Sequence, residues 1–232
     1  MTVFKSQIQR IHAEPGYILH IRPYRETSAI LDVFTKNHGR IHLVGRGLRK
    51  SSSKKNRPPE LFTKYEFAFV SSHSELYTLT GMEVVNDCAH LFSPYQLCCC
   101  LYLNELLLRV LQREDAHHEV FVDYQTVLQN IYQRSHESIE INLRLFEKKL
   151  LQNLGYGICF NNIKAEEFYI FQSSKGFVKV LRDTKDSISG KGLKAFANDE
   201  VLIEDRRAIK KMMRETLLPL IGDRPLKTRE LF

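Results

Sequence analysis

Residues 17–81 consist of short runs in which polar and apolar side chains alternate, and no other feature of the sequence limits the fold so strongly. Alternation with a period of two is typical of strands that bury one face. The second and third runs are joined by a four-residue turn, 36–39, that ends in glycine, and no run has the period of a helix. Strands are predicted at residues 17–24, 29–35, 40–46, 64–70 and 75–80.

Five strands within about 65 residues are enough to form a small closed barrel. Closure pairs the two edge strands, whose unpaired N–H and C=O groups would otherwise favour aggregation. We therefore expect a barrel of the oligonucleotide-binding (OB) type. A two-sheet barrel of the SH3-like type is the structural alternative.

After Gly81 the pattern changes to that of helices. Helices are predicted at residues 97–112, 120–132, 139–154, 193–197 and 201–218. Gly155 suits a left-handed helix cap, and Pro219 should break the last helix. The residues from 159 to 182 are irregular and strand-like. The predicted fold class is α+β, with an OB domain over residues 1–82 and a mainly helical domain over residues 83–232.

The positive charge is confined to the first third of the chain. Residues 1–81 hold thirteen Lys and Arg against six Asp and Glu, a net charge of +7, whereas residues 82–232 hold twenty-one of each. Such a domain attracts polyanions through counterion release and long-range steering. The charge alone leaves nucleic acid, the ribosome and a membrane surface as alternatives.

A basic loop of twelve residues, 46–57, follows the third predicted strand and has no acidic residue. Its glycine and serine residues let the cations follow phosphates of varying spacing, so it is the first candidate for DNA contact; the alternative is a solvated surface loop. Its six cations are Arg46, Arg49, Lys50, Lys54, Lys55 and Arg57.

A second candidate for DNA contact lies on the predicted strands beside that loop. Arg22, Tyr24 and Arg25, with Arg40, would form a platform in which the aromatic ring stacks on a base while the guanidinium groups contact phosphates. Equally, Tyr24 could belong to the barrel core or its rim.

Motifs for catalysis are missing from the sequence. It contains no phosphate-binding glycine loop and no nucleophile elbow, and Glu147-Lys148-Lys149 resembles the end of a nuclease signature only in a predicted helix, where a nuclease needs a strand. His117 and His118 point in different directions on a helix, which disfavours a metal site. No C-x-x-C pair occurs, so the five cysteines should be buried thiols.

The length and the opening residues give the expected compartment. No stretch approaches the roughly 18 apolar residues that span a bilayer, and the start lacks the apolar core of a secretory signal. We expect a cytoplasmic protein without a membrane partner.

Two features of the predicted helical domain could bind a partner. Residues 206–214 carry basic side chains at helical spacing, which form either a second DNA contact or a solvated face paired with neighbouring acids. Arg144, beside the apolar positions Leu143 and Leu151, would suit an acidic-hydrophobic peptide tail; the alternative is an arginine that faces water.

The sequence resembles the RecO family of bacterial recombination mediators of the RecF pathway. In the first domain the resemblance rests on residues 16–19 (GYIL), 22–28 (RPYRETS), 31–35 (LDVFT), 38–40 (HGR) and 45–49 (GRGLR). In the second it rests on residues 102–107 (YLNELL), 143–147 (LRLFE), 154–157 (LGYG) and 224–231 (RPLKTREL).

The resemblance implies an OB barrel followed by a helical domain, and binding and annealing of single- and double-stranded DNA. It implies a partnership with RecR, and with it the loading of RecA onto DNA coated by the single-stranded DNA-binding protein. The basic loop would be the main DNA contact. Leu143, Arg144 and Leu151 would receive the acidic-hydrophobic C-terminal tail of the coating protein. An association with the nucleoid follows.

The sequence departs from the family pattern at one point. Many members bind zinc through four cysteines after the Gly-Tyr-Gly element, but this chain has only Cys159 there. Four-coordinate structural zinc needs four ligands, so we expect no metal and no other cofactor. An RNA- or ribosome-binding OB module and a metal-dependent nuclease remain as alternative functions.

Overall fold

The computed structural model of the chain describes residues 9–49, 58–71, 76–87, 92–133, 136–222 and 224–231. The chain forms two compact units, one of residues 1–122 with 231–232 and the other of residues 123–230, and each is treated by itself below. The predicted domain boundary near residue 82 stays a prediction.

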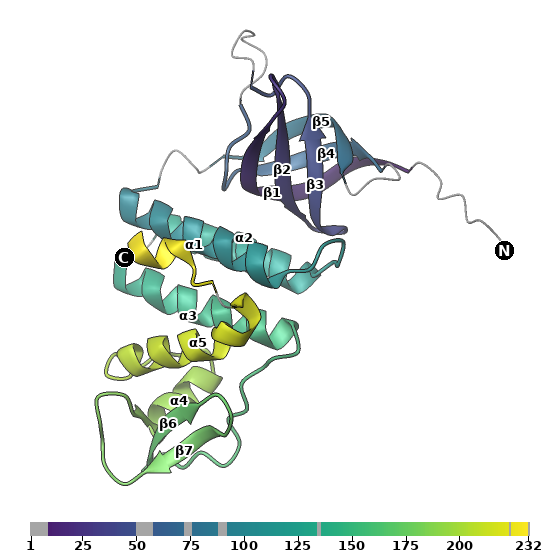
Figure 1. Cartoon of the computed structure of the whole chain (residues 1–232). Helices are drawn as coiled ribbons and strands as arrows, with labels where there is room; N and C mark the ends of the chain where they lie inside the picture. The colour runs from purple at the N-terminus through teal and green to yellow at the C-terminus, as the bar shows by residue number, and fades with distance from the viewer. Residues whose placement is uncertain are drawn as a thin grey trace, which may run out of the picture. The chain divides into compact units, whose positions relative to one another are not determined.

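Five strands close into a barrel in the first unit, in the order β1-β2-β3-β5-β4 (Figure 1). They are β1 (Arg10–Tyr24), β2 (Ser28–Thr35), β3 (Gly39–Gly45), β4 (Lys64–Val70) and β5 (Tyr77–Asn86). The neighbours are antiparallel, except that β3 runs parallel to β5. The predicted five-stranded barrel of the OB type is confirmed.

Two strands are longer than the sequence pattern predicted. β1 begins at Arg10 rather than Tyr17, and β5 continues to Asn86 rather than ending at Thr80. The register of each strand against β4 shifts within or beside the added segment. In β1 the shift lies between Ile11 and Glu14, and in β5 a shift lies opposite Ala68 and Phe69 of β4. A bulge interrupts strict alternation, which hid these segments from a search for period two.

Side chains that point into the barrel form a continuous apolar core. Buried and half-buried side chains alternate along the whole of β3. Ile41 and Leu43 are buried, while Arg40, His42 and Val44 are only half-buried. The buried members of the core are Ile18, Ala29, Leu31, Val33, Ile41, Leu43, Tyr65, Phe67 and Phe69.

Helix α1 (Pro94–Val110) belongs to the same unit as the barrel. It begins with a capping box, in which the Ser93 side chain accepts from the backbone N–H of Gln96 and the Gln96 side chain accepts from the N–H of Ser93. The buried side chain of Asn104 donates from Nδ2 to the carbonyl oxygen of Leu19 over 2.9 Å. Leu19 lies at a register shift of β1, between Ile18 and His20, so this bond joins the helix to an irregular point of the barrel.

Helix α2 (His118–Gln133) starts in the first unit and continues into the second. The ring of Phe121, in its first turn, packs against Phe34 and Tyr17 of the barrel at centroid distances of 5.5 and 5.7 Å. Both barrel side chains are buried. This end of the barrel is therefore covered by aromatic packing.

The second unit combines helices with a small sheet (Figure 1). Its further elements are α3 (His136–Asn153), β6 (Phe168–Gln172), β7 (Gly176–Val180), β8 (Ile188–Ser189), α4 (Gly190–Ala197), α5 (Arg206–Ile221) and a 3-10 helix (Lys227–Leu231). The strand-like segment of residues 159–182 is confirmed by β6 and β7. After α3, Gly155 has a φ of 82°, as predicted for a left-handed cap.

The last α-helix differs from its prediction at both ends. It begins at Arg206 rather than at Val201, and the carboxylate of its N-cap residue Asp205 accepts bonds from the backbone N–H and the hydroxyl of Ser189 instead of capping α5. Pro219 does not break it, since the helix runs to Ile221. A proline so near the C-terminal end removes only one of the final hydrogen bonds.

We predict that Asn104→Ala lowers the free energy of unfolding by about 2 kcal/mol, because it leaves the buried carbonyl of Leu19 without this donor. Urea unfolding followed by circular dichroism would measure the change. Asn161→Ala, at an exposed position, is the control and should lie within about 0.5 kcal/mol of wild type. Equal stability of the two variants would contradict the prediction.

Candidate nucleic-acid interface

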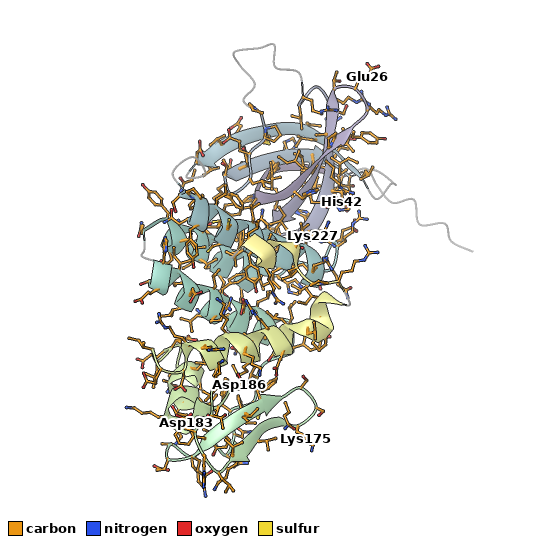
Figure 2. All side chains as sticks on the ribbon, turned by 60° about the vertical axis from the view of Figure 1, so that its left-hand side comes forward. Glu26, His42, Lys175, Asp183, Asp186 and Lys227 are labelled. Carbon is orange, nitrogen blue, oxygen red and sulfur yellow. The ribbon has the colours of Figure 1, made fainter. Side chains whose placement is uncertain are left out.

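The outer face of β1, β2 and β3 carries a cluster of charged side chains. The cross-strand pairs place Asp32 of β2 between His20 of β1 and His42 of β3. Arg22 lies two residues further along β1, and Arg40 two residues before His42 on β3. Figure 2 labels His42 on the barrel. Arg40 and His42 thus share one face of β3.

Asp32 is the centre of this cluster and was missed by the sequence analysis. Its carboxylate is 7% exposed and lies 3.3 Å from Nη2 of Arg22 and 3.7 Å from Nδ1 of His20. Nε2 of His42 contacts the other carboxylate oxygen. A single buried carboxylate thus orients basic side chains from two neighbouring strands. An acid within the apolar run of β2 was the one available signal.

A further arginine joins the cluster from the segment between α1 and α2. Arg113 forms a β-bridge with Arg40, and the N–H of Glu114 donates to the carbonyl of Arg40 over 3.0 Å. Gly39 makes this approach possible, since a Cβ there would lie 2.1 Å from the carbonyl oxygen of Asp115. Sequence reasoning could not find Arg113, because the contact joins residues some seventy positions apart.

The packing of the arginines changes their electrostatics. Burial lowers the pKa of Arg40, and the like charges of Arg113 and Arg22 lower it further, although Asp32 opposes them. Among the described residues, no acceptor bonds to the buried Nε of Arg40. Arg40 remains charged at neutral pH, since the ordinary pKa of an arginine is so high. The face therefore presents closely spaced positive charges.

The turn between β1 and β2 brings the second group of candidates together. The guanidinium carbon of Arg25 lies 5.2 Å from the ring centre of Tyr24. Arg49 donates from Nη1 to the carbonyl of Arg25 and from its backbone N–H to the carbonyl of Thr27, over 3.2 and 3.0 Å. The start of the basic loop is thus held beside this turn, whose tip carries Glu26 (Figure 2).

Not all predicted contacts can be placed. Arg46 and Arg49 are exposed, and Arg22 and Arg25 are exposed as well. Tyr24 is only half-buried, and Arg25 covers one of its faces. The predicted contacts Lys50, Lys54, Lys55 and Arg57 lie outside the described residues. DNA contact by each of these residues stays a prediction.

The predicted partner site on α3 has a different character from the one expected. Leu143 and Leu151 are buried in the core, 4% and 0% exposed, so they offer no surface to a peptide. Arg144 is largely buried and pairs with Glu147 at 2.5 Å. It nevertheless lines a small recess together with Glu140, Ile141, Val201, Arg206 and Lys210.

Three of the five basic side chains of α5 are paired with acids, whereas Arg207 and Arg214 are exposed. Lys210 lies 2.7 Å from Glu140, Arg206 3.5 Å from Glu137, and Lys211 2.7 Å from Asp186, which is labelled in Figure 2. The bond from Lys210 lowers the pKa of Glu140, although burial opposes it. These pairs favour the solvated, self-paired face over a second DNA contact.

The residues of the nuclease-like triplet have structural partners. Nζ of Lys148 donates to the carbonyls of Phe196 and Ala197 at the end of α4, over 2.6 and 3.0 Å, while Glu147 pairs with Arg144. Of the two adjacent histidines, His117 contacts Asp115 at 3.2 Å, and His118 is exposed. Neither place assembles a catalytic group.

The position of the family's zinc lobe holds aromatic packing instead of metal ligands. Phe177 packs against Phe160 and Phe171 at centroid distances of 5.6 and 5.5 Å, and Phe160 also packs against Phe196. Cys159 is exposed, contrary to the expectation of a buried thiol. Across the parts of the chain that are described, no three His, Cys, Asp or Glu side chains are arranged to hold a metal ion. A four-ligand zinc site does not fit these residues.

Within the described ranges, none of the helices combines the length and the apolar character that crossing a bilayer requires.

Two family models match the chain. One is described as Recombination protein O N terminal and covers residues 10–87, and the other as Recombination protein O C terminal and covers residues 92–230. DNA repair protein RecO of Coxiella burnetii (strain RSA 493 / Nine Mile phase I) is 37% identical over 96% of this chain and 98% of its own length. The protein of that name from Cellvibrio japonicus is 37% identical over 96% of this chain and 97% of its own.

The charged face has a consequence for stability. The pKa of His42 is lowered, mainly by burial. The negative charge of Asp32 raises this pKa, and the positive charges of three arginines lower it: Arg113, Arg22 and Arg40. Below the ordinary histidine pKa of about 6.5, the unfolded chain therefore takes up a proton that the folded chain resists. Stability at this position is lost as the pH falls through that range.

We predict that His42→Gln reduces the loss of stability between pH 7.5 and 5.5, because the variant lacks this protonation. Urea unfolding at several pH values would measure it. His12→Gln, at an exposed position on β1, is the control and should keep the wild-type dependence. A wild-type pH dependence in His42→Gln would refute this account of the cluster.

Proposed function

Because the chain belongs to the RecO family, we propose that it is a DNA repair and recombination mediator that binds single- and double-stranded DNA through its barrel and acts without catalysis. The observation that supports this most directly is the placement of charge. The net charge of +7 lies in residues 1–81, and Arg22, Arg40, Arg46 and Arg49 lie on the outside of the barrel or its loops.

The proposed mechanism is electrostatic. Two complementary strands repel each other, and a basic surface that neutralises both lowers this repulsion while it raises the local concentration of DNA. The cations of the barrel suit this role, since Arg25 and Arg49 are held at the β1–β2 turn and Arg22 and Arg40 lie on the neighbouring strands. Annealing of strands coated by the single-stranded DNA-binding protein would follow.

The proposal extends to partners. The surface around the recess beside Arg144 would contact the acidic-hydrophobic tail of the coating protein, with Ile141 and Val201 as apolar contacts. Arg206 and Lys210 would exchange their present partners, Glu137 and Glu140, for carboxylates of the tail. Leu143 and Leu151 would support this site from the core. With RecR, the protein would help to load RecA, and it would work in the cytoplasm at the nucleoid.

We predict that reversing five cations of the basic loop weakens DNA binding by about a hundredfold or more at low salt and abolishes annealing of coated strands. The salt dependence of binding should also become shallower, by about 0.9 log units for each phosphate of duplex DNA that the variant no longer neutralises. Fluorescence anisotropy and an annealing assay would measure both. The substitutions are Arg46→Glu, Arg49→Glu, Lys50→Glu, Lys54→Glu and Lys55→Glu.

A control variant carries the same change of charge on exposed cations of the second unit and should bind DNA within about threefold of wild type. Its substitutions are Lys175→Glu, Arg182→Glu, Lys191→Glu, Arg207→Glu and Arg214→Glu. Equal losses in the two variants would show that total charge, rather than the barrel, governs binding.

We predict that Arg144→Gln/Glu147→Gln weakens binding of the tail peptide about tenfold or more and leaves DNA affinity unchanged, since it removes one charged donor from the recess. Replacing both residues avoids an unpaired buried carboxylate. Lys210→Gln, at a half-exposed position, tests the same recess with little risk to folding. Wild-type peptide affinity in both variants would show that this recess does not bind the tail.

A further inference from the structure

A groove opens in the side of the barrel where β3 ends. The pairing of β3 with β5 consists of Leu43 with Tyr77 and Val44 with Thr78, after which β5 continues to Asn86 along β4. The seam between the two strands therefore opens beyond Val44. The resulting groove has a volume of about 350 Å³, which lies in the range of ligand-binding clefts.

The lining of this groove combines apolar side chains with polar groups and a positively charged residue. Leu48, Leu79, Met82 and Val84 line it together with Tyr65, and Arg46 is the one charged residue among its described lining residues. Gly45 lets Leu48 fold against the seam, since a Cβ at this glycine would lie 2.2 Å from the Leu48 side chain. The groove thus combines apolar side chains with the guanidinium group of Arg46.

The rest of the described barrel offers little apolar surface to a ligand. The rings of Phe67 and Phe69 are buried in the core, and Arg25 lies over Tyr24. The large apolar side chains exposed on the described barrel strands are Val84 and Val85, both on β5, at 47% and 51%. Of these two, only Val84 lines the groove.

We propose that this groove holds an unstacked nucleobase of single-stranded nucleic acid, with Arg46 on the adjacent phosphate. A nucleotide joins a flat, weakly polar ring to an anion, and the groove joins apolar side chains to a cation, with no carboxylate among the lining residues that the structure describes. Arg49, held at the neighbouring turn, continues the positive charge along the path of the backbone. A paired and stacked base cannot enter, so the groove favours single strands.

This inference rests on the proposed DNA binding and adds a contact that depends on the base. The experiment compares an oligothymidylate with an abasic strand of the same length, in anisotropy titrations of wild type, Val84→Gln and Val85→Gln. The two substitutions are matched in chemistry and exposure and differ in whether the residue lines the groove. The ratio of the two dissociation constants isolates the base from the phosphates.

Wild type should prefer the thymidine strand about fivefold or more, Val84→Gln should lose most of this preference, and Val85→Gln should keep it. Affinity for a duplex should be the same in all three proteins. Equal binding of both strands by wild type, or an unchanged preference in Val84→Gln, would refute base binding in the groove without contradicting the proposed DNA binding. Failure of wild type to bind either strand would instead overturn the proposed function, and the groove with it.

Discussion

Closure of the barrel depends on β1, a long strand whose two halves pair with different neighbours. Its second half pairs with β2 and its first half with β4. A strand of 15 residues can turn between two neighbours only if its pairing is interrupted, and both of its ladders contain a shift of register. Such a shift leaves backbone groups without ladder partners. Asn104 of α1 supplies one of these partners at Leu19, which explains a buried amide within an otherwise apolar helix.

The same closure decides which side chains are available for function. Every second residue of β2 and β3 is committed to the core, so the alternate positions must carry the charged groups. Asp32 occupies such a position, and its burial among Arg22, His20 and His42 would be costly without these partners. The carboxylate neutralises part of the face but fixes the directions of its cations. Cations held in place lose less conformational freedom when they bind phosphates.

Sequence reasoning identified what is periodic and missed what is long-range. The strands of the barrel follow from alternation, and the cap at Gly155 follows from the need for a left-handed residue. Arg113 belongs to the basic face because it forms a β-bridge with Arg40, which lies far from it in the sequence. A local sequence pattern cannot predict such a contact. Arg144 was placed on the correct helix, but its pairing with Glu147 and the burial of Leu151 depend on what packs against that helix. Periodicity shows that a helix has an apolar face, and it does not show which partners complete the charges at its edge.

The electrostatic contrast between residues 1–81 and residues 82–232 lies in how the charges are paired as well as in their number. Arg206, Lys210 and Lys211 of α5 each lie within 4 Å of a carboxylate, so their fields are largely cancelled at the distance of a DNA backbone. Arg46 and Arg49 form no ion pair with any residue that the structure describes. An unpaired cation keeps its counterions until a phosphate replaces them, and the release of these counterions drives association. Residues 82–232 carry no net charge and pair three cations of α5 with carboxylates, whereas residues 1–81 carry the whole excess of +7 and therefore produce the stronger attraction for a polyanion.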